Sequence, residues 1–124
     1  RELINMGKKI LVIEDETEVA KMIKTRLEAS QFSVATASDG VEGLDAMSSD
    51  VPDLIILDVM MPRMDGYTFL RELKSKQMKT LPPIIVLTAK DQLKELFQME
   101  GVADYITKPF DAQDLLTKVQ THLA

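Results

Sequence analysis

Short apolar runs alternate with helix-like segments along the whole chain, and this alternation constrains the fold more than any other feature. The runs are rich in β-branched residues and lie at 10–13, 32–37, 54–57, 84–87 and 105–107. Between them, apolar residues recur three or four positions apart, which is the spacing of an amphipathic helix. The pattern therefore predicts strands at the runs and helices over residues 17–30, 41–48, 67–76, 90–100 and from an Asp111 cap onward.

Five strands that alternate with five helices predict an α/β fold, in which one parallel sheet carries helices on both faces. Because βαβ crossovers are right-handed, the expected arrangement is a doubly wound open sheet. The length of 124 residues fits a single domain. We assign residues 8–124 to this domain and set residues 1–7 aside as an N-terminal extension or a cloning remnant.

Composition argues against several classes of function. The chain holds 15 basic and 20 acidic residues, and the net charge of −5 disfavours a broad face for nucleic acid. With no Cys and a single His, the chain lacks thiol chemistry and the usual Cys and His metal sites. No Gly-rich nucleotide-binding motif is present. The apolar runs are far shorter than the roughly 20 residues of a membrane span, so a cytoplasmic location is expected.

Polar residues follow the apolar runs at the point where each strand is predicted to end. Glu14 and Asp15 follow the first strand, Asp58 the third, Thr88 the fourth and Lys108 the fifth. In a doubly wound sheet, ligands bind beyond the carboxyl ends of the strands. We therefore expect three carboxylates, one hydroxyl and one ammonium to converge on one edge of the sheet.

This set of charges calls for a divalent cation. Glu14, Asp15, Asp58 and Lys108 together carry a charge of −2, and like charges about 4 Å apart repel by roughly 4 kcal/mol at an effective dielectric constant near 20. All the available ligands are hard oxygens, which favours Mg²⁺, or Mn²⁺, over zinc. An Asp beside such a cation and a Lys can attack a phosphoryl group, and Thr88 could then donate a hydrogen bond to the transferred oxygens.

Four segments of the chain resemble the receiver domain of two-component response regulators. They are residues 13–16 (IEDE), 57–66 (LDVMMPRMDG), 87–89 (LTA) and 104–110 (DYITKPF), in this order and spacing. The resemblance extends over residues 8–123. It implies a flavodoxin-like receiver fold with strand order 2-1-3-4-5.

The resemblance also implies a role for each site residue. Asp58 would be the phosphoacceptor and, with Asp15, a direct Mg²⁺ ligand. Met60 would bind the cation through its backbone carbonyl, and Glu14 through a metal-bound water. Lys108 would contact the phosphoryl group.

Two further features follow from the same resemblance. Thr88 and Tyr105 would form a coupled switch pair, in which the aromatic ring turns inward when the hydroxyl moves. The peptide bond between Lys108 and Pro109 would be cis.

The expected function is a phosphorylation-controlled signalling switch. A sensor histidine kinase or phosphotransfer protein would donate the phosphoryl group, and the domain would catalyse its own phosphotransfer and slow dephosphorylation, without turnover of an external substrate. An effector domain or target protein would meet the helix at residues 90–100, the fifth strand and the last helix. No direct contact with nucleic acid or membrane is expected.

Two other functions stay open at this point. The first is a receiver-like binding module that works without phosphorylation. The second is an aspartyl-phosphate phosphatase, which in the haloacid-dehalogenase type needs an acid two positions after the nucleophile. Met60 occupies that position and cannot transfer protons, so this alternative is disfavoured.

Overall fold

The computed structural model describes residues 5–76, 80–89 and 101–123. Helices and strands alternate along the chain as the hydrophobic pattern predicts. The elements are β1 (Lys9–Ile13), α2 (Thr17–Ala29), β2 (Ser33–Ala37), α3 (Gly40–Ser49), β3 (Leu54–Asp58), α4 (Gly66–Ser75), β4 (Ile84–Ala89), β5 (Asp104–Lys108) and α6 (Ala112–Leu123).

The five strands form one parallel sheet in the order β2-β1-β3-β4-β5. This confirms the predicted α/β class and strand order. Four helices longer than one turn lie within the described residues, rather than the five that were predicted. The helix predicted over residues 90–100 lies outside the described residues, and this accounts for the difference.

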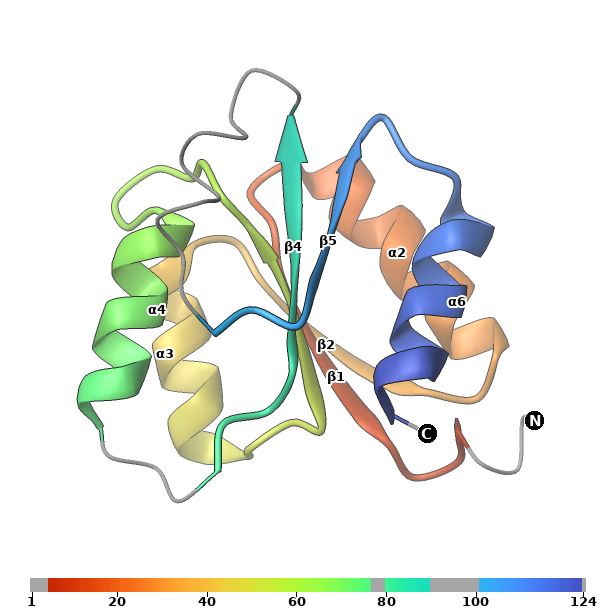
Figure 1. Ribbon diagram of the computed structural model, residues 1–124, viewed down its shortest axis with the longest axis horizontal. Coiled ribbons are helices and arrows are strands. Elements are labelled where there is room, and N and C mark those ends of the chain that lie inside the picture. The colour runs from red at the N-terminus through yellow and green to blue at the C-terminus, as the bar shows by residue number, and fades with distance from the viewer. Residues whose placement is uncertain (1–4, 77–79, 90–100, 124) are drawn as a thin grey trace.

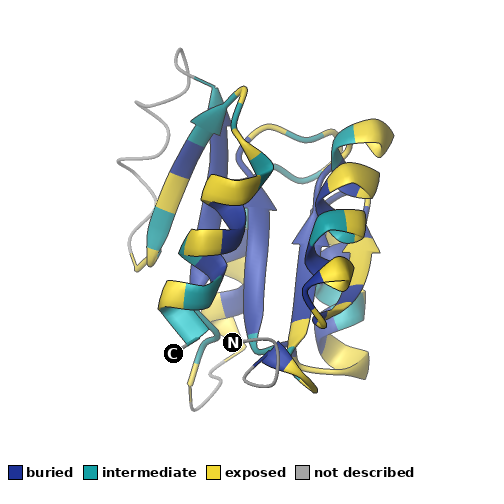
Figure 2. Ribbon diagram, turned by 90° about the vertical axis from the view of Figure 1, so that its right-hand side faces the viewer, coloured by how far each residue is buried: buried dark blue, intermediate teal, exposed yellow. Residues whose placement is uncertain are grey.

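Helices cover both faces of the sheet, with α2 and α6 on one face and α3 and α4 on the other (Figure 1). Each face has its own apolar cluster. Successive residues of β1 enter opposite clusters, because side chains alternate across a strand. The central strands are therefore apolar along nearly their whole length, and they are buried while the outer surfaces of the helices are exposed (Figure 2).

The ends of the elements differ slightly from the sequence prediction. Strand β4 continues to Ala89, so Thr88 lies within the strand instead of after it. Asp111 caps the last helix as predicted, since its Oδ1 accepts a hydrogen bond of 2.8 Å from the backbone N–H of Gln113. The cis peptide bond between Lys108 and Pro109 is also present.

Part of the segment before the first strand packs on the domain. Asn5 is buried, and its side-chain amide donates a 2.8 Å hydrogen bond to the backbone carbonyl of Ser30, at the end of α2. Within the described part of the chain, every helix falls short of the length and hydrophobicity that a membrane crossing requires.

Candidate functional site

Three carboxylates meet at the carboxyl end of the sheet. Ile13 pairs with Leu57 in the β1–β3 register, so Glu14 and Asp58 follow at the same level of neighbouring strands. Carboxylate oxygens of Glu14, Asp15 and Asp58 all lie within 4.8 Å of one another. Glu14 and Asp58 are buried, whereas Asp15 is exposed. The sheet geometry thus brings together the acids that the sequence predicted, although 43 positions separate Asp15 from Asp58.

Lys108, the last residue of β5, is the cation of this cluster. Its Nζ lies 2.8 Å from Oε1 of Glu14, 3.3 Å from Oε1 of Glu16 and 3.5 Å from Oδ2 of Asp58. The Lys108 side chain is mostly buried, which strengthens these ion pairs relative to pairs on the surface. One ammonium therefore forms ion pairs with three carboxylates, and a fourth carboxylate, that of Asp15, lies beside them.

The excess of carboxylates over cations affects the pKa of Asp58. Burial is the main cause that raises its pKa to about 8, and the hydrogen bond and the charge of Glu14 raise it further. Lys108 opposes these effects only in part. For Lys108 itself, burial lowers the pKa, but Glu14 and Asp58 outweigh burial and raise it above its ordinary value.

The donor set fits a divalent cation. Oε1 of Glu14 is buried, and its one charged partner among the described residues is Nζ of Lys108 at 2.8 Å, an ammonium that also approaches Glu16 and Asp58. One ammonium shared among several carboxylates leaves buried negative charge that is costly, and a divalent cation, or a water bound to that cation, would offset it. Three carboxylates with hard oxygen atoms suit Mg²⁺ or Mn²⁺.

The remaining predicted site residues lie around this cluster. Thr88 is fully buried on β4, and its hydroxyl donates a 3.1 Å hydrogen bond to the carbonyl of Ala89. Tyr105 lies on β5 opposite Val86, with 47% of its surface exposed. Met60 follows Asp58 by two positions and is also about half exposed.

The comparisons with known proteins bear on this arrangement directly. The family described as the response regulator receiver domain matches residues 10–120. The chain belongs to this family. A phosphorylation-controlled switch is consistent with that membership, and receiver domains do not turn over a separate substrate as classical enzymes do.

Individual relatives support the assignment. The alkaline phosphatase synthesis transcriptional regulatory protein PhoP of Bacillus subtilis is 42% identical over 120 residues, which cover 95% of this chain and 49% of PhoP. Response regulator MprA of Mycobacterium bovis is 41% identical, with coverage of 95% and 51%. The receiver domain therefore spans about half the length of the curated relatives that it matches.

A solved structure shows the same fold. The signal receiver domain of a signal transduction histidine kinase from Syntrophus aciditrophicus superimposes with a TM-score of 0.84 at 35% identity, covering 94% of this chain and 90% of that chain. The predicted receiver fold is thus confirmed by both sequence and structure.

Two residues of the site were missed by the sequence analysis. Glu16 contacts Lys108, and its backbone N–H donates to Oε2 of Glu14 at 3.1 Å. The signal was the third acid of the Glu14-Asp15-Glu16 run. Gly66 is the second: a Cβ there would lie 2.6 Å from the backbone carbonyl oxygen of Asp58, so only glycine fits without movement.

Proposed function

We propose that this receiver domain accepts a phosphoryl group on Asp58 from the phosphohistidine of a sensor kinase or phosphotransfer protein. The observation that carries the proposal is the buried carboxyl of Asp58, held among two further acids and within 3.5 Å of Nζ of Lys108. An isolated surface Asp has neither the charge partner nor the cation ligands for this reaction. The geometry of the cluster therefore favours phosphorylation over the phosphorylation-independent binding module.

The residues around Asp58 divide the chemistry between them. The carboxylates of Asp15 and Asp58 and the backbone carbonyl of Met60 would hold Mg²⁺ directly, and Glu14 would act through a bound water. When bound, the cation supplies the positive charge that lets the carboxylates ionise together and that neutralises the phosphoryl oxygens.

The chain's own groups perform the transfer. An oxygen of the ionised Asp58 carboxylate attacks phosphorus, and the bond from phosphorus to the donor imidazole breaks. The ammonium of Lys108 interacts with the phosphoryl oxygens. The domain catalyses this transfer and also the slow hydrolysis, in which water takes the phosphoryl group, inorganic phosphate leaves and the Asp58 carboxylate is restored. No external substrate is turned over.

The output is a change of conformation. The Thr88 hydroxyl, which donates to the Ala89 carbonyl in this structure, would turn to donate to the phosphoryl group. Tyr105, now half exposed on the neighbouring strand, would move inward as the hydroxyl leaves. Phosphorylation then shifts the population between two states. Strand β5 and helix α6 would present the change to a partner, together with residues 90–100, which lie outside the described residues.

The wider setting of the domain is part of the same proposal. PhoP is named a transcriptional regulatory protein and is about twice as long as the matched segment. We infer that residues 8–124 act as a receiver that controls an effector domain or a separate target, with residues 1–7 as an extension. A cytoplasmic location follows, because ATP-dependent kinases supply the phosphoryl group there.

The decisive experiment is labelling with a small phosphodonor. With acetyl phosphate and Mg²⁺, the wild-type protein should gain the mass of one phosphoryl group, and Asp58→Asn should gain none. Asp45→Asn, which alters an exposed carboxylate on α3, is the matched control and should label like wild type. Equal labelling of Asp58→Asn and wild type would refute the assignment, and a wild type that never labels would favour the binding module.

A further inference from the structure

The segment between β3 and α4 carries the Met60 carbonyl, and it is fixed at both ends. The Val59 N–H donates to the Leu87 carbonyl at 3.1 Å, and the Gly66 N–H donates to the Val59 carbonyl at 2.7 Å. These bonds fix the two ends of the segment, but they leave residues 60–65 to be placed by other contacts.

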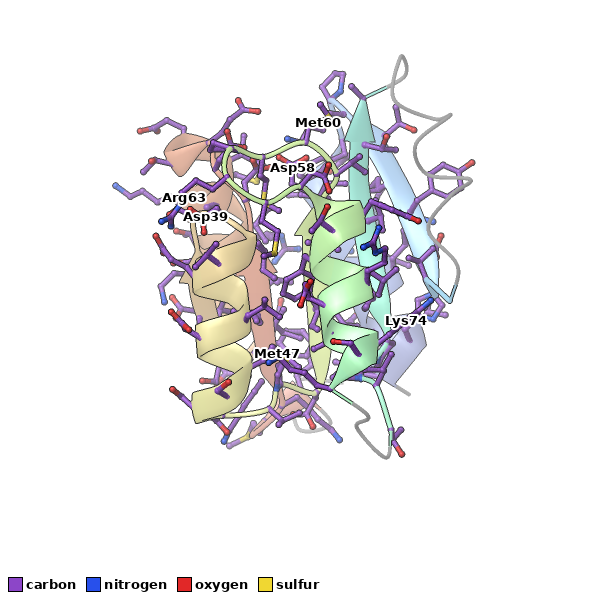
Figure 3. The ribbon with its side chains drawn as sticks, turned by 90° about the vertical axis from the view of Figure 1, so that its left-hand side faces the viewer. Asp39, Met47, Asp58, Met60, Arg63 and Lys74 are labelled. Atoms are coloured by element: carbon purple, nitrogen blue, oxygen red, sulfur yellow. The ribbon has the colours of Figure 1, made fainter. Side chains whose placement is uncertain are left out.

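Arg63 makes a polar contact that joins the middle of this segment to another part of the fold. Its Nε donates to Oδ2 of Asp39 at 2.7 Å, and one terminal nitrogen lies 2.5 Å from the same oxygen. That nitrogen also lies 4.0 Å from a Glu42 carboxylate oxygen. Arg63 and Asp39 lie side by side at the same end of the molecule as Asp58 and Met60 (Figure 3).

Asp39 is a rigid partner for this arginine. It is buried, and its other carboxylate oxygen accepts a 3.0 Å hydrogen bond from the Glu42 N–H, so it is the N-cap of α3. The backbone hydrogen bond to Glu42 is the main influence on Asp39 and, with Arg63, lowers its pKa against the opposing effect of burial. Both oxygens of a buried carboxylate are thus occupied.

The backbone of Arg63 adopts an unfavourable conformation while its side chain pairs with Asp39. Its φ is +64°, a left-handed conformation that non-glycine residues rarely adopt. Such a conformation persists where surrounding contacts impose it, and it occurs often at functional sites. The next residue, Met64, packs over Gly40 at the start of α3. The segment is therefore clamped onto α3 through two consecutive side chains.

The contact between Arg63 and Asp39 lies close to Glu14 and Asp15 in the fold. Asp39 follows strand β2 by two positions, and the carbonyl of Ala37, the last residue of β2, accepts a 3.0 Å hydrogen bond from the Glu14 N–H. The connection that follows β3 and the one that follows β2 are thus joined through Arg63 and Asp39, on either side of the carboxylates.

We infer that Arg63 is a positioning residue that holds the Met60 carbonyl in place for the cation through its ion pair with Asp39. This inference rests on the proposed function, since it assigns a role to the segment only if Mg²⁺ binds there. Arg63 does not touch the reacting atoms. Its effect is on the affinity of the site for the cation, because a carbonyl free to move loses entropy when it binds.

The test compares Mg²⁺ affinities without any phosphodonor. Arg63→Gly removes the guanidinium and is compatible with a positive φ, so the backbone strain cannot explain its effect. Asp39→Asn removes the charge and keeps a good capping residue. Each variant should bind Mg²⁺ about tenfold more weakly in an NMR titration of backbone amides, and the backbone amides of Met60, Met61 and position 63 should exchange faster with solvent.

Two further variants make the result specific. The double variant should bind no more weakly than either single variant, because both remove the same contact. Lys9→Met breaks an ion pair with Asp50 at the opposite end of the sheet and should leave the affinity unchanged. Single variants that bind within about twofold of wild type, or effects that add in the double variant, overturn the inference. A wild type that fails to bind Mg²⁺ overturns the proposed function itself.

Discussion

Among the described residues, the ammonium of Lys108 is the one cation at the carboxylate cluster, and it limits how much negative charge the site can hold. It lies within 3.5 Å of carboxylate oxygens from Glu14, Glu16 and Asp58, and only Glu16 of these is well exposed to water. Buried charges without a partner are strongly destabilising. The metal-free site therefore keeps a proton on Asp58 near neutral pH, and the reactive form requires added positive charge.

Replacement of Lys108 should separate metal binding from phosphorylation. In Lys108→Gln, we expect labelling by acetyl phosphate to slow by about tenfold or more, because the phosphoryl oxygens lose a cationic partner. Mg²⁺ affinity should not fall, since the carboxylates then lack a competing cation. Rates of labelling and Mg²⁺ titrations measure the two effects. Lys21→Gln, on the exposed face of α2, is the control, and an unchanged labelling rate in Lys108→Gln would contradict the assigned role.

Met60 should make the phosphorylated state long-lived. An acyl phosphate decays by attack of water, and the half-exposed Met60 side chain offers no polar group to orient that water. We expect the phosphorylated domain to persist for minutes or longer without a phosphatase. Met60→Asn should shorten this lifetime several-fold, as measured by loss of the phosphorylated mass over time. Decay of the wild type within seconds would show that another group orients the water.

Helix α4 begins in close contact with the backbone at the end of β3. Gly66 begins the helix, and its Cα lies so near the Asp58 carbonyl that an added Cβ would come within 2.6 Å of the oxygen. Gly40 begins α3 in the same way, but a Cβ there would meet the flexible side chain of Met64. The two glycines therefore provide a matched pair.

We predict that Gly66→Ala is the more damaging of the two substitutions. Displacing backbone at the end of β3 should lower the free energy of unfolding by about 2–4 kcal/mol. Gly40→Ala should cost about 1 kcal/mol or less, because a side chain can move aside. Urea denaturation measures both values. A larger loss in Gly40→Ala would mean that Met64 is fixed more rigidly than the strand end.

The elements were predictable from local signals, and the contacts between them were not. Hydrophobic spacing placed all the described helices and strands to within a few residues, since it reports burial directly. The pair of Arg63 with Asp39 had no such signal, because 24 residues separate them and each alone reads as a loop charge. Asn5 was left out of the fold for a similar reason: its partner, Ser30, is visible only in three dimensions.

The carboxylate site was predictable because the sheet topology brings together residues that are far apart in the sequence. Parallel strands end at one edge, so residues after the first, third and fifth strands had to converge there. Glu16 was not chosen because an acid at the start of a helix is usually a solvated residue that complements the helix dipole. Only the position of the Lys108 side chain reveals its contact.

The stability of the entire domain should depend on pH through Asp58. Its pKa rises from 3.8 in the unfolded chain to about 8 in the fold. A raised pKa contributes stability that is fully present below about pH 4 and is lost as the pH rises through about 8. Relative to Asp58→Asn, the metal-free wild type should therefore lose about 3 kcal/mol of unfolding free energy between about pH 6 and about pH 9.

Mg²⁺ provides the check on that prediction. A ligand that binds only the folded state stabilises it, and this cation binds ionised carboxylates, so it should restore stability more at high pH than at low pH. Denaturation with EDTA or with excess Mg²⁺ measures the difference. A pH dependence that is identical in wild type and Asp58→Asn would assign it to other groups.

The residues that form the core of this domain are different from those on the exposed surfaces of its helices. The central strands are buried along their length and turn polar only at their tips, while the outer surfaces of α2 and α6 face water (Figure 2). Substitutions on these outer helix surfaces, away from the carboxyl end of the sheet, therefore leave the site residues intact. Evolution can copy such a unit many times and edit each copy's exterior alone, so that one inherited chemistry carries many separate messages in the same cell.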